Sequence, residues 1–129
     1  MNADEEPLYR EALAVHRRTL GDSHPHTLDS INNLALLLKK QGKLDDAEPL
    51  SREALAGYRR TLGDEHPFTL TSIFNFAGLL WAQGKRAEAL ELARQALAGF
   101  RRVLGEGHPS TQTVLRTFNR FSEREKMAW

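Results

Sequence analysis

Histidine is the residue type whose spacing first suggests chemistry in this chain. His24, His66 and His108 follow one another at a constant spacing of 42 residues. Imidazole is a common metal ligand, but the ligands of one metal must lie close together in space. Side chains at a long constant spacing stay apart, so these three are predicted to start helices and not to bind a metal. His16 lies elsewhere in the sequence pattern and is predicted to pack.

Residue arrangements that carry catalysis are missing from the sequence. The chain has no cysteine, which excludes disulfides and cysteine-based zinc sites. It also has no Gly-rich phosphate loop, nucleophile elbow or His-Glu-x-x-His pattern. Serine and acidic residues are scattered without a partner base. We therefore expect a protein that is not an enzyme and needs no cofactor.

Pairs of arginine recur at the same spacing as the histidines. The pairs are Arg17-Arg18, Arg59-Arg60 and Arg101-Arg102. One interpretation is a basic ridge that binds RNA or another polyanion. The other is charge at helix C-termini that faces solvent and nearby acidic residues. The net charge of +1 favours the second interpretation, so nucleic acid is not the expected partner.

The histidines and arginines recur because the whole chain repeats. Residues 20–27, 62–69 and 104–111 share the pattern Leu-Gly-x-x-His-Pro-x-Thr. Roughly 25 of the 42 positions agree between the two full repeats, and such a period is typical of solenoid proteins. We expect one domain over residues 1–129. It divides into a partial repeat (1–20), two full repeats (21–62 and 63–104) and a final partial repeat (105–129).

Each full repeat contains the signals of two helices. Proline follows the histidine, at the favoured first helical position, and apolar residues continue at helical spacing until Gly42. A second helix follows, with Pro49 expected in its first turn, where proline is tolerated. Gly57 inside that helix predicts a close contact with a neighbouring helix. The aligned repeats predict an all-α fold of six helices, over residues 4–19, 25–40, 44–61, 67–82, 86–103 and 109–126.

This pattern resembles a tetratricopeptide repeat. The pair Leu34-Ala35 is followed by Gly42, Ala47 and Ala54 at the spacing of that family. The longer period and the segment Asn32-Asn33-Leu34-Ala35-Leu36-Leu37 are similar to the kinesin-light-chain type of the repeat. The resemblance implies a right-handed α-solenoid of antiparallel helices. It also implies a scaffold whose partner is another protein or a peptide.

The resemblance also suggests where a partner binds, because the first helix of each tetratricopeptide repeat lines a concave groove. It implies a role in binding an extended, partly acidic peptide for Asn32, Asn33, Leu36, Lys39, Lys40, Phe74, Asn75, Trp81, Arg116 and Arg120. Asn33 and Asn75 are expected to hydrogen-bond a peptide backbone, unless their amides are bonded within the array. The arginines are expected to attract acidic side chains.

Phe74 and Trp81 are seven residues apart and therefore share one helix face. An exposed aromatic pair on such a face can anchor a partner. It can also be packing, or a patch through which copies of the chain associate. The sequence leaves these three alternatives open.

The two ends of the chain combine polar and apolar residues. Glu5, Asn119 and Ser122 stand where the full repeats have buried-type residues, which suits helix faces that meet water. Several apolar residues nevertheless suggest a homodimer through the terminal helices or helix exchange as an alternative. They are Leu8, Tyr9, Leu115, Phe118, Phe121 and Trp129.

Two features bear on location. The longest apolar run, Leu34 to Leu38, is too short to span a bilayer, so no membrane association is expected. The absence of cysteine suits a reducing compartment. We therefore expect a cytoplasmic protein.

Overall fold

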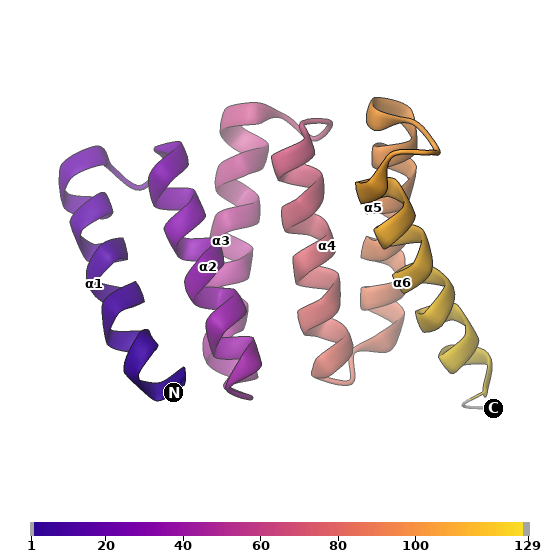
Figure 1. Ribbon diagram of the computed structural model, residues 1–129, viewed down its shortest axis with the longest axis horizontal. Coiled ribbons are helices and arrows are strands. Elements are labelled where there is room, and N and C mark those ends of the chain that lie inside the picture. Colours follow the sequence, from indigo (N-terminus) through magenta and orange to yellow (C-terminus); the bar gives the residue numbers. More distant parts are fainter. Residues whose placement is uncertain (1, 128–129) are drawn as a thin grey trace. The chain divides into compact units, whose positions relative to one another are not determined.

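The computed structural model describes residues 2–127, which form six α-helices joined by short turns (Figure 1). The helices are α1 (Asn2–Leu20), α2 (Pro25–Lys40), α3 (Leu44–Leu62), α4 (Pro67–Ala82), α5 (Arg86–Leu104) and α6 (Pro109–Met127). No strand occurs in this part of the chain, and the expectation of an all-α fold is confirmed. Trp129, one of the apolar end residues named above, lies outside the described residues.

Contacts divide the chain after Gly63 into two compact units. Unit 1 contains α1, α2 and α3, and unit 2 contains α4, α5 and α6. Within each unit, consecutive helices run antiparallel and pack side by side (Figure 1). The assignment of the whole chain to a single domain stays a prediction.

The core of each unit lies along its helix contacts. In unit 1, Leu28, Ile31 and Leu38 of α2 are completely or almost completely buried. The small residues Ala47 and Ala54 of α3 are fully buried as well, so α2 and α3 approach closely. Unit 2 repeats this arrangement with large apolar residues on α4 and alanines on α5. Its buried residues include Leu70, Ile73, Leu79, Leu80, Ala89, Ala93 and Ala96.

The recurring histidine caps the helix that follows it, as the sequence predicts. The Nδ1 atoms of His24, His66 and His108 accept hydrogen bonds from backbone N–H groups two residues further on, at 3.1, 3.0 and 3.0 Å. Such a bond satisfies one of the N–H groups that the first turn of a helix leaves without a partner. Proline occupies the next position, where its missing N–H costs nothing.

A glycine inside the second helix of each full repeat allows the close helix contact that the sequence predicts. A Cβ atom added to Gly57 would collide with the Leu28 side chain, and one added to Gly99 would collide with Leu70. The two glycines therefore fix how closely α3 approaches α2 and how closely α5 approaches α4.

The ends of α1, α3, α5 and α6 differ by one or two residues from the sequence expectation, and two details have a local reason. Pro49 lies beyond the first turn of α3, where it leaves one carbonyl of the preceding turn without its helical partner. Helix α6 continues to Met127, because Lys126 stands where Gly42 and Gly84 end α2 and α4.

Candidate functional site

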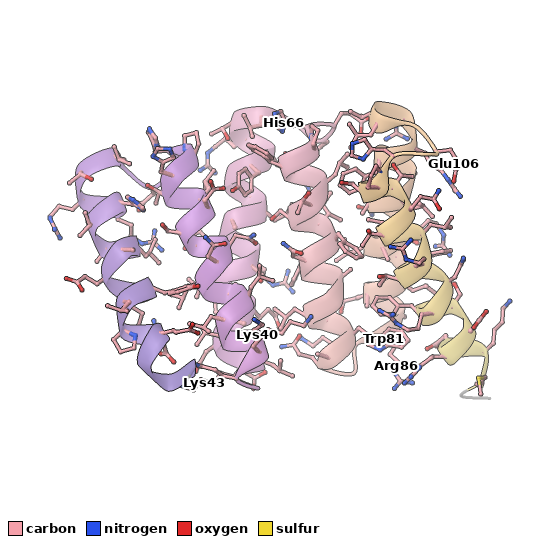
Figure 2. All side chains as sticks on the ribbon, viewed as in Figure 1. Lys40, Lys43, His66, Trp81, Arg86 and Glu106 are labelled. Carbon is pink, nitrogen blue, oxygen red and sulfur yellow. The ribbon has the colours of Figure 1, made fainter. Side chains whose placement is uncertain are left out.

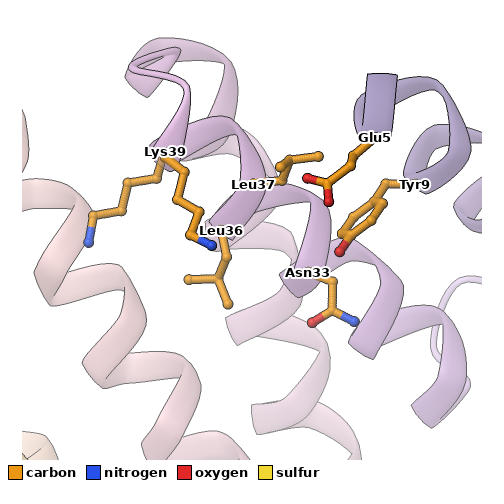
Figure 3. A pocket seen from close by; sticks show the side chains of 7 residues that line it. Glu5, Tyr9, Asn33, Leu36, Leu37 and Lys39 are labelled. Atoms are coloured by element: carbon orange, nitrogen blue, oxygen red, sulfur yellow. The ribbon is translucent and has the colours of Figure 1, made fainter. Parts of the chain in front are cut away.

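A hollow of about 500 Å³ opens between α1 and α2 in unit 1. We call it the lysine hollow. It is lined by Glu5, Tyr9, Asn33, Leu36, Leu37, Lys39 and Lys40. Figure 3 shows Glu5 and Tyr9 coming from α1, whereas Asn33, Leu36 and Lys39 come from α2. Four of the predicted groove residues are thus brought together, while Asn32 is half-buried and does not line this hollow.

The two lysines of the hollow differ from most basic residues of unit 1. Lys39 and Lys40 have no acidic partner among the described residues. By contrast, Lys43 donates to Glu6 at 2.8 Å, and this bond and Arg10 hold the pKa of Glu6 below its ordinary value. The lysine hollow therefore presents two cations that form no ion pair with the described residues, the Glu5 carboxylate, an amide and apolar surface to anything that enters it (Figure 2 labels Lys40 and Lys43).

A second hollow of about 310 Å³ continues the first along the same two helices. Tyr9 and Asn33 line both, and Leu8, Ala12 and Ser30 complete the second. We call the two hollows together the α1–α2 trough. Its walls carry an exposed leucine, Leu8, and an exposed tyrosine, Tyr9, so the trough is apolar on one side and basic at one end.

Unit 2 has a hollow of its own, of about 320 Å³. Its lining carries no charged side chain and consists of Thr71, Phe74, Asn75, Phe100, Pro109, Ser110, Thr113 and Val114. The predicted residues Phe74 and Asn75 are thus neighbours in one hollow. Arg116 lies beside it and donates to Thr113 Oγ1 at 3.3 Å, and Arg120 is exposed.

Trp81 does not share the surroundings of Phe74. Its ring stacks on Phe121 of α6, with the ring centroids 4.1 Å apart and the planes 3° from parallel. The guanidinium of Arg86 lies 4.8 Å from the centroid of the Trp81 ring, and Figure 2 shows both side chains at the same end of α4. Through these contacts Trp81 packs within unit 2. That Trp81 also anchors a binding partner stays a prediction.

With this geometry in place, comparisons with known proteins identify the family. The family model described as Tetratricopeptide repeat matches residues 6–58 and 30–102. The chain belongs to the tetratricopeptide repeat family. No curated protein sequence shows a detectable similarity to it.

Solved structures extend this assignment to the kinesin-light-chain type of repeat, and confirm the resemblance seen in the sequence. The nearly identical TPR-like repeats of a Podosopora anserina protein named as a kinesin light chain match with a TM-score of 0.87 and 29% identity. That match covers 93% of this chain and 57% of the other. BtubC (BKLC) from P. vanneervenii matches in fold, with a TM-score of 0.86, 19% identity, and coverage of 95% and 49%. The chain thus spans about half the length of these structures.

Most arginines of the three pairs in these tetratricopeptide repeats are engaged by nearby groups, and Arg18 is the exception among the described residues. Arg17 donates to Asp22 at 2.8 Å and to Glu53 at 2.7 Å, and these bonds raise the pKa of Arg17. Arg102 donates to Glu65 at 2.6 and 2.8 Å, which lowers the pKa of Glu65. The contacts favour the interpretation of charge paired at helix ends, and RNA binding stays an untested alternative.

The histidines of the repeats do not converge on a metal site. Within residues 2–127 no group of three or more potential ligands could hold a metal ion. His16, expected to pack, is half-buried but also makes a polar contact, with Nδ1 2.6 Å from Ser30 Oγ. It therefore joins α1 to α2 through a hydrogen bond. Tyr58, at the same repeat position, likewise bonds α3 to α2 through Asp29, whereas the Phe100 side chain has no polar group.

Glu5 and Tyr9 are lining residues that the sequence did not assign to the site. A signal existed, because the repeat alignment places Tyr9 at the position of Ser51 and Ala93, where only small side chains occur in this chain. A large side chain at that position of α1 indicates that this face of α1 is not packed against a neighbouring helix as the same face of α3 or α5 is.

Among the helices of the described chain, none is long and apolar enough to cross a membrane.

Proposed function

We propose that the chain is a non-enzymatic scaffold that binds an extended, partly acidic segment of another protein. The observation that carries the proposal is the lysine hollow, where Lys39 and Lys40 lack acidic partners and stand beside Asn33 and Leu36. Free ammonium groups attract carboxylates. An amide offers both a donor and an acceptor to a peptide backbone.

Each unit contributes a different binding position in this proposal. The lysine hollow of unit 1 takes an acidic residue and an apolar neighbour, with Leu36 and Tyr9 as the apolar contacts. The unit 2 hollow takes an uncharged side chain against Phe74, with Asn75 bonding the backbone and Arg116 attracting an acid nearby. Support for a protein partner comes from the family, whose repeats mediate protein–protein contacts. A cytoplasmic location remains part of the proposal.

The test is selection of binding peptides from a random display library, followed by affinity measurement on synthetic versions. Selected peptides should contain Asp or Glu next to an apolar residue. The variant Lys39→Glu with Lys40→Glu should weaken binding at least tenfold, which corresponds to about 1.4 kcal/mol. Asn33→Ala should weaken it about threefold, and binding should fall with salt because exposed charges are screened.

The matched control is Arg60→Glu, which changes the charge on α3 outside the trough, where Arg60 donates to Ser23. It should alter affinity less than about twofold. Asn75→Ala and Arg116→Glu probe the unit 2 hollow separately. If peptides bind but neither the double lysine variant nor Asn33→Ala changes their affinity by more than about twofold, the lysine hollow is not the binding site.

A further inference from the structure

Helix α1 has one packed side and one open side. Leu13 of α1 is buried, and His16 joins α1 to α2 through Ser30. On a neighbouring side of the helix, Leu8 and Val15 are 65% and 38% exposed. The open side of α1 and the adjoining surface of α2 form the α1–α2 trough.

In unit 2, a third helix packs against the two helices that correspond to α1 and α2. The repeat aligns α1 and α2 with α5 and α6, residue by residue at twice the repeat spacing. In unit 2, α4 packs on α5, and its Trp81 lies over Phe121 of α6. Phe121 aligns with Leu37, which lines the lysine hollow. The trough therefore has the form of a seat for a helix of the α4 type.

We propose that α6 of a second copy of this chain docks in the α1–α2 trough. Helix α6 is one repeat later than α4 and has the same place in the repeat. Its side toward the next helix is more polar, because Gln112, Asn119 and Ser122 stand where α4 has the buried residues Leu70, Ala77 and Leu80. At the position of Trp81 it carries Glu123, which is exposed and has no partner among the described residues. In the pose of α4, the carboxylate of Glu123 faces the unpaired ammonium groups of Lys39 and Lys40.

A second pair of opposite charges meets at the other end of the same helix. Phe74 and Thr113 line one hollow in unit 2. Their counterparts in the docked pair are Arg116 of the second copy's α6 and Asp29 of the first copy's α2. The Asp29 carboxylate accepts a hydrogen bond from the Tyr58 hydroxyl and keeps further acceptor positions for a guanidinium.

A third pair follows from a contact that unit 1 already makes. Arg17 of α1 donates to Glu53 of α3 at 2.7 and 2.9 Å. Arg101 and Glu11 are the corresponding residues of the second copy's α5 and of the first copy's α1. Arg101 bonds Glu106 through Nε, so its terminal nitrogens can reach Glu11. Three complementary pairs thus surround the contact, and each would be absent if the second copy were docked in a reversed direction.

The apolar centre of the contact is modest, which makes the association reversible. Leu115 of α6 is half-buried and meets Leu8 and Ala12 of the trough, whereas Phe118 lies under Arg94 of its own α5. At the position of Gly57, however, α1 carries Val15. Because a Cβ atom at Gly57 would already collide with Leu28, α1 cannot be approached as closely as α3 is.

The contact joins different surfaces of the two copies. A contact between one pair of copies therefore leaves a free surface on each, and further copies can add head to tail.

The test is the average mass of the purified chain by analytical ultracentrifugation, from micromolar to millimolar concentration at low and high salt. The mass should rise continuously above the 14.6 kDa of one chain, without a plateau at the dimer, and the rise should shrink with salt.

Charge exchange makes the test specific. Glu123→Lys alone, and Lys39→Glu with Lys40→Glu alone, should each weaken association at least fivefold. Mixing the two variants should restore it, because each altered face then meets its complement. Arg60→Glu serves as the control and should associate like the unaltered chain.

Two results would overturn the proposal. One is a chain that stays at 14.6 kDa over the whole range. The other is association that the single-sided charge changes leave intact or that mixing does not restore. No peptide enters this experiment, so its outcome is independent of the peptide-binding proposal.

Discussion

At the scale of single residues, the histidine that opens each repeat acts through one ring nitrogen. Nδ1 of His66 accepts the backbone N–H of Phe68 at 3.0 Å, which is the role that Ser, Thr, Asp or Asn usually has at a helix start. The ring also contacts the Phe68 ring, with centroids 4.9 Å apart. The recurrence of this residue is thus explained by helix capping.

We predict that His66→Ala lowers the free energy of unfolding by about 1 kcal/mol, because one N–H of α4 loses its acceptor. His66→Asn should lose no more than a few tenths of that, since its side-chain oxygen accepts the same bond. Urea unfolding followed by circular dichroism measures both. Equal losses in the two variants would assign the effect to the ring contact with Phe68 instead of the cap.

The hydroxyl of Tyr58 provides a residue-scale prediction about pH. Burial, together with the hydrogen bond to Asp29, raises the pKa of Tyr58 well above its ordinary value of 10. A raised folded-state pKa adds stability that is complete below pH 10 and is lost as the pH rises, because only the unfolded chain releases the proton easily.

Between pH 9 and pH 11 the unaltered chain should therefore lose up to about 1.4 kcal/mol more stability than Tyr58→Phe, which has no proton to release. Urea unfolding of both proteins at the two pH values gives the difference. The same loss in both proteins would contradict the assignment of the shift to Tyr58.

At the scale of elements, the contact between paired helices depends on a glycine facing a leucine. Gly99 of α5 is buried, and any Cβ at that position would collide with the Leu70 side chain of α4. Overfilling a packed contact costs about 1–3 kcal/mol, which exceeds the roughly 1 kcal/mol that a helix gains when glycine is replaced.

We predict that Gly99→Val destabilises the protein by about 2 kcal/mol or more. The matched control is Ala98→Val, at the exposed neighbouring position of α5, which should cost about 0.5 kcal/mol through helix propensity alone. Thermal or urea unfolding distinguishes them. A similar cost for both variants would show that α4 and α5 adjust to a larger separation.

The elements themselves were predictable because their signals are local. A histidine and a proline mark the starts of α2, α4 and α6, a glycine follows each of the helices α1 to α5, and the repeat transfers the marks along the chain. The surroundings of Trp81 were not predictable in this way. The sequence shows which face of α4 carries Trp81, but its stacking partner Phe121 comes from α6. Likewise, the lysine hollow needs Tyr9 and Glu5 of α1, which no pattern within α2 reveals.

At the scale of the whole molecule, charge distinguishes the surfaces of a chain whose net charge is only +1. Basic residues such as Arg17 and Arg102 are held by acidic neighbours. Lys39 and Lys40 form no ion pair within the described part of the chain, and they line a hollow with an amide, apolar side chains and the single carboxylate of Glu5. Binding at this position, by an acidic peptide or by Glu123 of a second copy, is the common element of both proposals.

The most direct measurement is NMR mapping of the chain, at a concentration low enough to exclude association, during titration with a selected acidic peptide. We expect saturable shifts of the backbone amides around Tyr9, Leu36, Lys39 and Lys40, and of the Asn33 side-chain amide. The shifts should shrink as salt is added. A peptide that binds with saturation but leaves these signals unchanged, while shifting those of the turns near Arg59 and Arg101, would contradict the account.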